Sequence, residues 1–409
     1  MSKTELELSA KEIDFLLSPL AIRERARAIF ARTQQGLGAF RYHPEKMDAT
    51  VEIVLAVIRQ KYPDLKIPFH SRWGHFRVGG VDRVALLDAQ LKSLLPLERA
   101  RTKLDLVITS VLLDAGAGTQ WKYLESGQKV PIARSEGLGV ASLNMFMSGA
   151  MSSDPKELRA DADGLRGVTQ EALEKHFQVS STNPLLGVSG RLSLLRNLAG
   201  AVSDPKRFRD GRPGNILDFL IHQYGEHIPA TGLLRAVLDG FGSIWPGRLA
   251  VAGGRNLGDV WRHSQLGASA FASLVPFHKL SQWMTYSLIE PIEEAGVKVT
   301  GVEELTGLAE YRNGGLLLDS GLISLANPED SQKQWPPDSD LIIEWRALTI
   351  DRLDQIGEAV RHKLGKTAQE FPLAKVLEGG TWWAGRKLAA QARADGSPPL
   401  QIQSDGTVF

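Results

Sequence analysis

The sequence contains no cysteine among its 409 residues. That absence excludes disulfide bonds, cysteine-ligated zinc or iron–sulfur sites and thiol nucleophiles. An excess of charge is also lacking, since 48 Lys and Arg stand against 47 Asp and Glu, a formal net charge of +1. Nucleic-acid binders and proteins of anionic membrane surfaces usually show a basic excess. We therefore expect no nucleic acid and no membrane as a partner, but a small molecule.

Long apolar runs are missing as well. No stretch reaches the roughly 18 consecutive apolar residues that a membrane span needs. Residues 1–20 mix Lys, Glu and Asp with the apolar positions, unlike the apolar core of a secretory signal. The expected location is the cytoplasm.

The common cofactor motifs are absent too. Nine histidines occur, but none has the H-x-x-x-H or H-E-x-x-H spacing of a helical metal site. The glycines before Trp121 do not complete a dinucleotide-binding fingerprint, and Val360 replaces a glycine that a phosphate-binding loop before Gly365 needs. Gly187–Gly190 lacks the frame of a nucleophile elbow. We expect neither a metal nor another cofactor.

Strand signals are few, so the sequence predicts a mainly α fold. The first 62 residues read as three helices, one of them entered at Ser18 and Pro19. The run Leu104–Leu113 is typical of a buried helix, Trp121–Ile132 of a short hairpin, and Arg134–Met147 of another helix. We predict an N-terminal helical segment (1–62), a helical core (63–396) and a polar tail (397–409).

Functional signals concentrate between Val275 and Leu318. A helix predicted from Phe277 to Glu294 carries an apolar ridge on one side. Its other side shows a cation, an amide, rings and carboxylates at three-and-four spacing, namely Lys279, Gln282, Trp283, Tyr286, Glu290 and Glu293. A solvated face seldom has Trp and Tyr in this way, whereas a pocket wall uses rings for stacking and polar tips for orientation.

Further charged groups follow in the chain. Glu310, Tyr311 and Arg312 interrupt apolar flanks, which indicates either a functional site or an ordinary salt-bridged turn. Glu344 and Arg346 begin a long helix. The segment from His70 to His75 is dense in His, Arg and aromatics; it fits a structural loop or a basic patch for a ligand equally well, with Arg72 stacked on a ring in the first case.

The surviving chemistry is that of carboxylates with cationic and hydrogen-bonding partners. Cleavage of an N-glycosidic bond fits it, because an oxocarbenium-like transition state needs a carboxylate near the anomeric carbon, a polariser for water and a donor for the leaving nitrogen.

Several motifs resemble those of the uracil-catabolism family of the ring-opening pyrimidine pathway. They are His70-Ser-Arg-Trp, Leu112-Leu-Asp-Ala-Gly-Ala-Gly with Trp121 and Tyr123, Arg134-Ser-Glu-Gly, and Phe277-His-Lys-Leu-Ser-Gln-Trp with Tyr286-Ser-Leu. The resemblance covers almost the whole chain. It implies a role beside a cyclohydrolase-like pathway protein.

The C-terminal half also resembles, more remotely, the queuosine-nucleoside glycosylases. Phe277-His-Lys-Leu-Ser-Gln, Ala309-Glu-Tyr-Arg and Glu344-Trp-Arg-Ala match segments of that family in the same order. This likeness implies a helical core akin to DNA glycosylases and an N-ribosidic scissile bond. It places Lys279 and Glu310 at the ribosyl or leaving group. Glu310 stands where that family has Asp, Leu280 stands where it has Arg, and its queuine-binding residues have no clear counterpart here, so the base must differ.

Together the two resemblances imply an enzyme that hydrolyses ribosylurea, or its 5-phosphate, to urea and ribose or ribose phosphate. Glu310 would stabilise the cation or activate water, and Glu344 would position Arg346 or act as a second acid. Lys279 and Arg312 would hold sugar hydroxyls or phosphate. The remaining expected substrate-binding residues are Tyr311, Gln282, His278, Trp283, Tyr286, Arg346, His70, Arg72 and His75. Two alternatives remain: a non-catalytic partner that binds and channels an intermediate, and an amidohydrolase that cleaves the ureide C–N bond.

Overall fold

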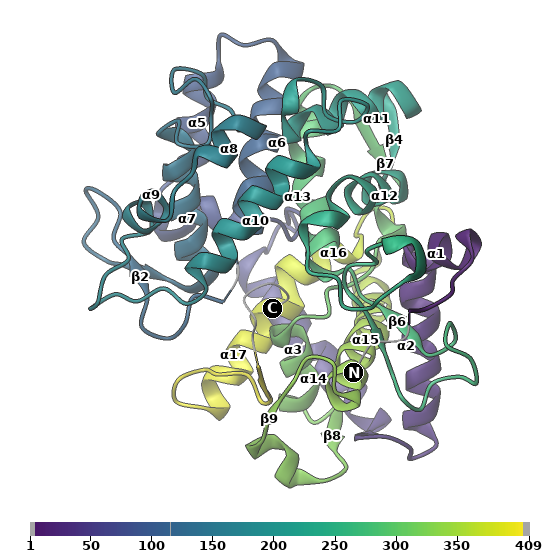
Figure 1. Cartoon of the computed structure of the whole chain (residues 1–409). Helices are drawn as coiled ribbons and strands as arrows, with labels where there is room; N and C mark the ends of the chain where they lie inside the picture. The colour runs from purple at the N-terminus through teal and green to yellow at the C-terminus, as the bar shows by residue number, and fades with distance from the viewer. Residues whose placement is uncertain (1–4, 115, 404–409) are drawn as a thin grey trace. The chain divides into compact units, whose positions relative to one another are not determined.

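A computed structural model of the chain describes residues 5–114 and 116–403. The fold is mainly α-helical, as predicted, and its strands are two to three residues long and pair two at a time (Figure 1). The chain forms two compact units, each assembled from separate segments. Unit 1 contains residues 5–70, 247–282 and 301–403, and unit 2 contains 71–246 and 283–300, Ala115 excepted.

This division differs from the predicted order of 1–62, 63–396 and 397–409, because distant segments join in each unit. Residues 404–409 of the predicted tail lie outside the described residues. Its earlier part is bound into unit 1, where strand β10 (Gln401–Ile402) pairs in parallel with β9 (Gln334–Trp335).

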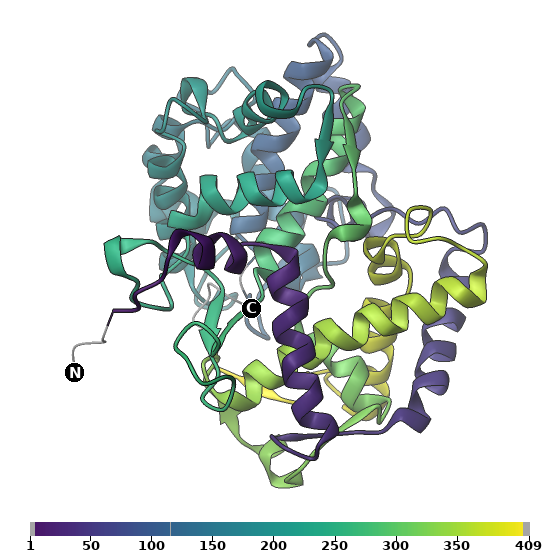
Figure 2. The same ribbon diagram turned by 90° about the vertical axis from the view of Figure 1, so that its right-hand side faces the viewer.

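Unit 1 is built on helices from both ends of the chain. They are α1 (Ala10–Leu16), α2 (Pro19–Gln34), α3 (Met47–Lys61), α14 (Tyr311–Asp319), α15 (Asp340–Leu364), α16 (Leu373–Val376) and α17 (Trp382–Ala392). Strand β1 (Phe40–Tyr42) pairs with β8 (Ile323–Leu325), and β5 (Val260–Arg262) with β6 (Leu274–Pro276). Figure 2 shows the purple helix α2 crossing the long yellow-green helix α15, against which it packs.

The three predicted N-terminal helices are α1, α2 and α3. Ser18 caps α2 by accepting from the Ala21 N–H, and Pro19 occupies its first turn, where the missing N–H costs nothing. Helix α15 ends at Gly365, whose φ of 64° is the left-handed conformation that glycine adopts without strain. Gly365, which resembles the second glycine of a phosphate-binding loop in the sequence, therefore terminates a helix.

Unit 2 is a second helical assembly. It contains α4 (Trp73–Phe76), α5 (Arg83–Leu91), α6 (Pro96–Leu112), α7 (Arg134–Met147), α8 (Ala162–Gly167), α9 (Gln170–His176), α10 (Val188–Ala201), α11 (Ile216–Tyr224) and α12 (Ala230–Phe241). The buried helix, the hairpin and the helix predicted between 104 and 147 are confirmed as α6, the pair β2 (Lys122–Tyr123) and β3 (Ile132–Ala133), and α7. Strand β4 (His227–Pro229) pairs in parallel with β7 (Lys298–Thr300).

Helix α13 (Lys279–Glu294) begins two residues later than predicted and contains Pro291. Its first four residues belong to unit 1 and the rest to unit 2. The predicted polar face is therefore divided: Lys279 and Gln282 lie in unit 1, whereas Trp283 and Tyr286 lie in unit 2. No described helix combines the length and the apolar character that a membrane crossing requires.

Candidate functional site

The acid at position 310 begins helix α14. Its two carboxylate oxygens accept the backbone N–H groups of Arg312 at 2.7 Å and Asn313 at 2.5 Å. Glutamate is not among the preferred N-cap residues, which are the shorter Ser, Thr, Asp and Asn. The carboxyl is buried, 8% of the residue being exposed, and burial raises the pKa of Glu310 against the opposing effects of these two N–H groups and the charges of Lys279 and His70.

Lys279 and His70 thus lie within electrostatic reach of Glu310 inside unit 1. Lys279 is the first residue of α13, where the helix dipole disfavours a cation. The negative charge of Glu310, on which Lys279 acts, offsets part of that cost. The structure brings together three predicted residues that are at least 31 positions apart in sequence.

His70 is held by an acid that the sequence did not reveal. Its Nδ1 lies 2.7 Å from Glu378 Oε2, and because a carboxylate only accepts, Nδ1 donates. The Tyr62 hydroxyl donates to the other oxygen of Glu378 at 3.4 Å; burial and Glu378 raise the pKa of Tyr62 to about 12, so it stays a neutral donor. The pair fixes the His70 ring and leaves Nε2 as the end available for chemistry.

Glu378 belongs to a single π-helical turn, Leu377–Thr381, between α16 and α17. Such turns are rare and often occur at functional sites. Gly379 and Gly380 let this turn pack closely, since a Cβ there would come within 2.4 Å of Ile67 and 2.6 Å of Val54. The glycine pair was the sequence signal for this turn, but nothing in the sequence linked it to His70.

Gln282 lies one helical turn after Lys279, on the same side of α13. It is 0% exposed, and neither its amide nitrogen nor its amide oxygen has a hydrogen-bond partner. Burying unpaired amide atoms costs about 1–3 kcal/mol each. A group of this kind indicates a position where a ligand supplies the missing partners.

Arg346 and Glu344 have different surroundings. Arg346 forms a bidentate pair with Asp259 at 2.7 and 2.8 Å and stacks on Phe277. Asp259 also accepts the Lys279 N–H at 3.0 Å, and it thereby fixes the start of α13. Despite burial, Arg346 and these hydrogen bonds hold the pKa of Asp259 well below its ordinary value. Asp259 was not predicted, because its partners come from distant segments.

Glu344 accepts from the Ala39 N–H at 2.6 Å and from His263. The Gln265 N–H donates to His263 Nδ1, so the proton of a neutral His263 is on Nε2, which donates to Glu344 at 3.1 Å. A Cβ at Gly38 would lie 2.5 Å from the same carboxylate. These contacts make Glu344 an anchor of the 38–39 loop, and its role as a second acid stays a prediction.

Three more predicted residues have contacts of their own. His278 adopts φ 48° and its Nε2 donates to the Leu16 carbonyl at 2.8 Å; burial lowers the pKa of His278, which keeps it neutral. Arg312 donates to the Gly396 carbonyl at 2.9 Å and lies over the ring of Tyr311. All three belong to unit 1, and their ligand contacts stay predictions.

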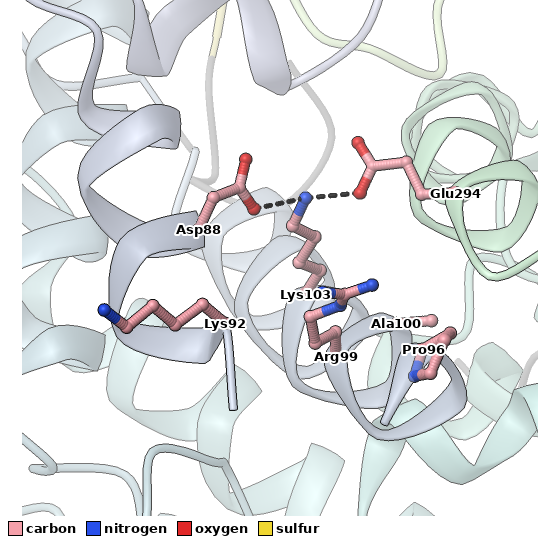
Figure 3. A pocket seen from close by; sticks show the side chains of 7 residues that line it. All are labelled: Asp88, Lys92, Pro96, Arg99, Ala100, Lys103 and Glu294. Carbon is pink, nitrogen blue, oxygen red and sulfur yellow. Dashed lines mark hydrogen bonds and ion pairs between the residues drawn. The ribbon is translucent and has the colours of Figure 1, made fainter. Parts of the chain in front are cut away.

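Unit 2 holds the other predicted residues, Arg72, His75, Trp283 and Tyr286, all of them at least partly buried. It also contains a pocket of about 310 Å³ lined by none of the predicted residues (Figure 3). There the buried Lys103 lies between Asp88, at 2.7 Å, and Glu294. Within 5–114 and 116–403, no three His, Asp or Glu side chains gather so as to hold a metal ion.

A protein-family model described as "Protein of unknown function (DUF1688)" matches residues 15–409. The chain belongs to this family. It is 37% identical to "Uracil catabolism protein 4" of Lachancea kluyveri, over 97% of this chain and 99% of that protein. It is 38% identical to "Protein urg3" of Schizosaccharomyces pombe (strain 972 / ATCC 24843), over 98% of this chain and all of that protein. The resemblance to the uracil-catabolism family is thereby confirmed for nearly the full length of the chain.

Proposed function

We propose that this protein acts in uracil catabolism and hydrolyses the N-ribosidic bond of ribosylurea or its 5-phosphate. The observation that carries the proposal is the buried Glu310 with Lys279 and His70 within electrostatic reach, His70 being tied to Glu378. The printed name of one relative supports the pathway. The remote likeness to queuosine-nucleoside glycosylases supports the bond.

In this reaction water adds to the anomeric carbon, the C–N bond breaks, and the urea nitrogen takes a proton. Each Glu310 oxygen uses one acceptor position on a backbone N–H and has a second one left. A carboxylate fixed in this way faces the oxocarbenium-like transition state without needing to reorient. Its burial strengthens that attraction.

His70 transfers the proton in this reaction. Glu378 holds Nδ1, so Nε2 takes a proton from water or delivers one to the leaving nitrogen. Glu378 acts through His70 and is a positioning residue. Lys279 and Gln282 bind the polar groups of the sugar, phosphate or ureide, with Lys279 favouring the phosphorylated form.

The direct test is incubation of the purified protein, without added metal, with ribosylurea and separately with its 5-phosphate. Equimolar urea and reducing sugar support N-glycoside hydrolysis, and the faster substrate decides the phosphate question. Ammonia and carbon dioxide in place of urea would indicate an amidohydrolase. Binding without any product would leave the protein as a non-catalytic partner.

The choice of variant matters because Glu310 also caps α14. Glu310→Ala removes the cap and costs about 0.5–2 kcal/mol of stability. Glu310→Ser keeps a preferred cap and removes the carboxylate. We expect its free energy of unfolding to lie within about 1 kcal/mol of the wild-type value. Its turnover should fall at least about 100-fold, the lower end of what one acid–base group contributes.

The same cap favours a second candidate. Because both Glu310 oxygens already accept backbone hydrogen bonds, a structural role explains part of the geometry. The chain would then bind an intermediate and pass it to a cyclohydrolase-like pathway protein. Complex formation between the two purified proteins, with no turnover by this one, is the result that would support this candidate.

A further inference from the structure

A buried polar cluster in unit 2 takes no part in the hydrolysis proposed above. Its centre is Arg72, with no exposed surface, next to α4 and surrounded by α6 and α7. Arg72 Nε donates to Ser110 Oγ at 2.7 Å. Ser110 in turn bonds Ser142, which donates to the Gly139 carbonyl. The glycine is needed, because a Cβ at 139 would come within 2.9 Å of His75.

The rest of the guanidinium is nearly saturated. Nη1 donates to His75 Nδ1 at 2.9 Å and to the Ser135 carbonyl at 3.2 Å, and it lies 3.1 Å from Asp114 Oδ1. An arginine always donates, so His75 Nδ1 accepts and the ring is neutral. Nη2 alone has no partner, although it is buried. The other contacts fix the direction in which its two N–H bonds point.

A second buried donor lies beside it. The ring of Trp283 is 5.5 Å from the Arg72 guanidinium carbon and 5.6 Å from the His75 ring. Trp283 Nε1 is buried and also lacks a partner. By contrast, the indole N–H groups of Trp73 and Trp121 each donate to a backbone carbonyl at 2.8 Å. Asp114 Oδ1 adds an acceptor without a well-aligned hydrogen bond.

Carboxylates already act on the buried cations here. Asp114 and Glu136 act on Arg72, and Asp114 also acts on Arg191. An anion such as phosphate would leave a buried negative charge uncompensated. A neutral group that accepts two N–H bonds and offers an N–H to a carboxylate matches the unpaired atoms. Burying these atoms unpaired is costly, so an occupant is favoured.

We propose that Arg72, Trp283 and Asp114 form a second recognition site, which binds a planar uncharged amide, imide or ureide group. Its carbonyl oxygen accepts from Arg72 Nη2 and Trp283 Nε1, and its N–H donates to Asp114. The site is independent of hydrolysis by Glu310. Uracil is the neutral probe, since the edge of its planar ring carries adjacent carbonyl and N–H groups. Inorganic phosphate is the anionic probe.

The test follows the indole N–H signals of the full-length protein labelled with 15N at tryptophan. The Trp283 signal is assigned by its loss in Trp283→Phe, and the Trp121 signal by Trp121→Phe. We expect uracil to shift the Trp283 signal and phosphate to leave it in place, with the Trp121 signal unchanged by either. No shift with uracil, or a shift with phosphate alone, would overturn the proposal.

Binding then separates this site from the proposed active site. Trp283→Phe should weaken uracil binding at least about 5-fold, the loss of one hydrogen bond of about 1 kcal/mol. Trp121→Phe should lower stability but keep uracil affinity. Glu310→Ser should still show the uracil-induced shift of the Trp283 signal, whether or not the wild type hydrolyses ribosylurea. The uracil site and the proposed hydrolysis can therefore fail independently of each other. Unchanged uracil affinity in Trp283→Phe would also count against the site.

Discussion

Replacing Gln282 by methionine should stabilise the free protein and damage its function. The side chains have similar volume, but methionine has no amide to bury. The amide of Gln282 is completely buried and both its polar atoms are unpaired. At about 1–3 kcal/mol for each atom, with part of the cost offset by relaxation or a trapped water, we expect the free energy of unfolding to rise by about 1–3 kcal/mol.

Gln282→Met should weaken ligand binding although it stabilises the fold. If a substrate supplies partners for both amide atoms, Gln282→Met loses two hydrogen bonds worth about 0.5–1.5 kcal/mol each, and Kd should rise about 5-fold to 150-fold. The assay combines urea denaturation of the free protein with calorimetric titration of ribosylurea and its 5-phosphate.

Gln178, an exposed glutamine, provides a control whose amide is paired. Its amide oxygen accepts from the Leu124 N–H at 2.9 Å and its amide nitrogen donates to the Leu124 carbonyl at 2.8 Å. Gln178→Met should therefore lower stability by about 1 kcal/mol and leave affinity unchanged. A Gln282→Met variant that loses stability and binds as tightly as the wild type would refute the reasoning, because the amide would then have an internal structural role.

If an ionised Glu310 is required, kcat/KM should fall on acidification at a pH above the ordinary glutamate value, because burial raises the pKa of Glu310. In Lys279→Met this fall should occur at a still higher pH, since Lys279 lowers the pKa of Glu310. An unchanged pH profile in Lys279→Met would mean that Lys279 does not act on Glu310. Burial lowers the pKa of His278, so below about pH 6.5 the unfolded state binds more protons than the folded state. Acidification should therefore lower the free energy of unfolding by up to about 1.4 kcal/mol per pH unit. In His278→Asn, whose asparagine tolerates φ 48°, urea denaturation should show a smaller dependence of this free energy on pH. Thr381→Val should raise unfolding stability, because the buried Thr381 hydroxyl has no partner, whereas Thr349→Val should lower it by about 1 kcal/mol, because Thr349 donates to the Trp345 carbonyl; equal effects would contradict this account.

The sequence by itself determined the helical class, several element boundaries and the family. Local rules suffice for these. Ser18 and Pro19 mark the start of α2, and Arg134–Met147 is recognised from its pattern with unchanged bounds. The family is carried by motifs that are contiguous in the chain and need no geometry. The sequence also pointed to Lys279, Gln282 and Glu310 through charges and amides in apolar surroundings.

Only the tertiary structure decided which of these groups meet. Glu378 lies 308 residues beyond His70 and holds its ring, and Asp259 lies 87 residues before Arg346. No periodicity relates such positions, because packing of distant segments creates the contact. The structure likewise divided the face of α13 between two units, which a helical pattern read alone presents as one surface. Local patterns fix which groups a helix carries, whereas burial and neighbours fix whether those groups cap, clamp or remain unpaired for a ligand.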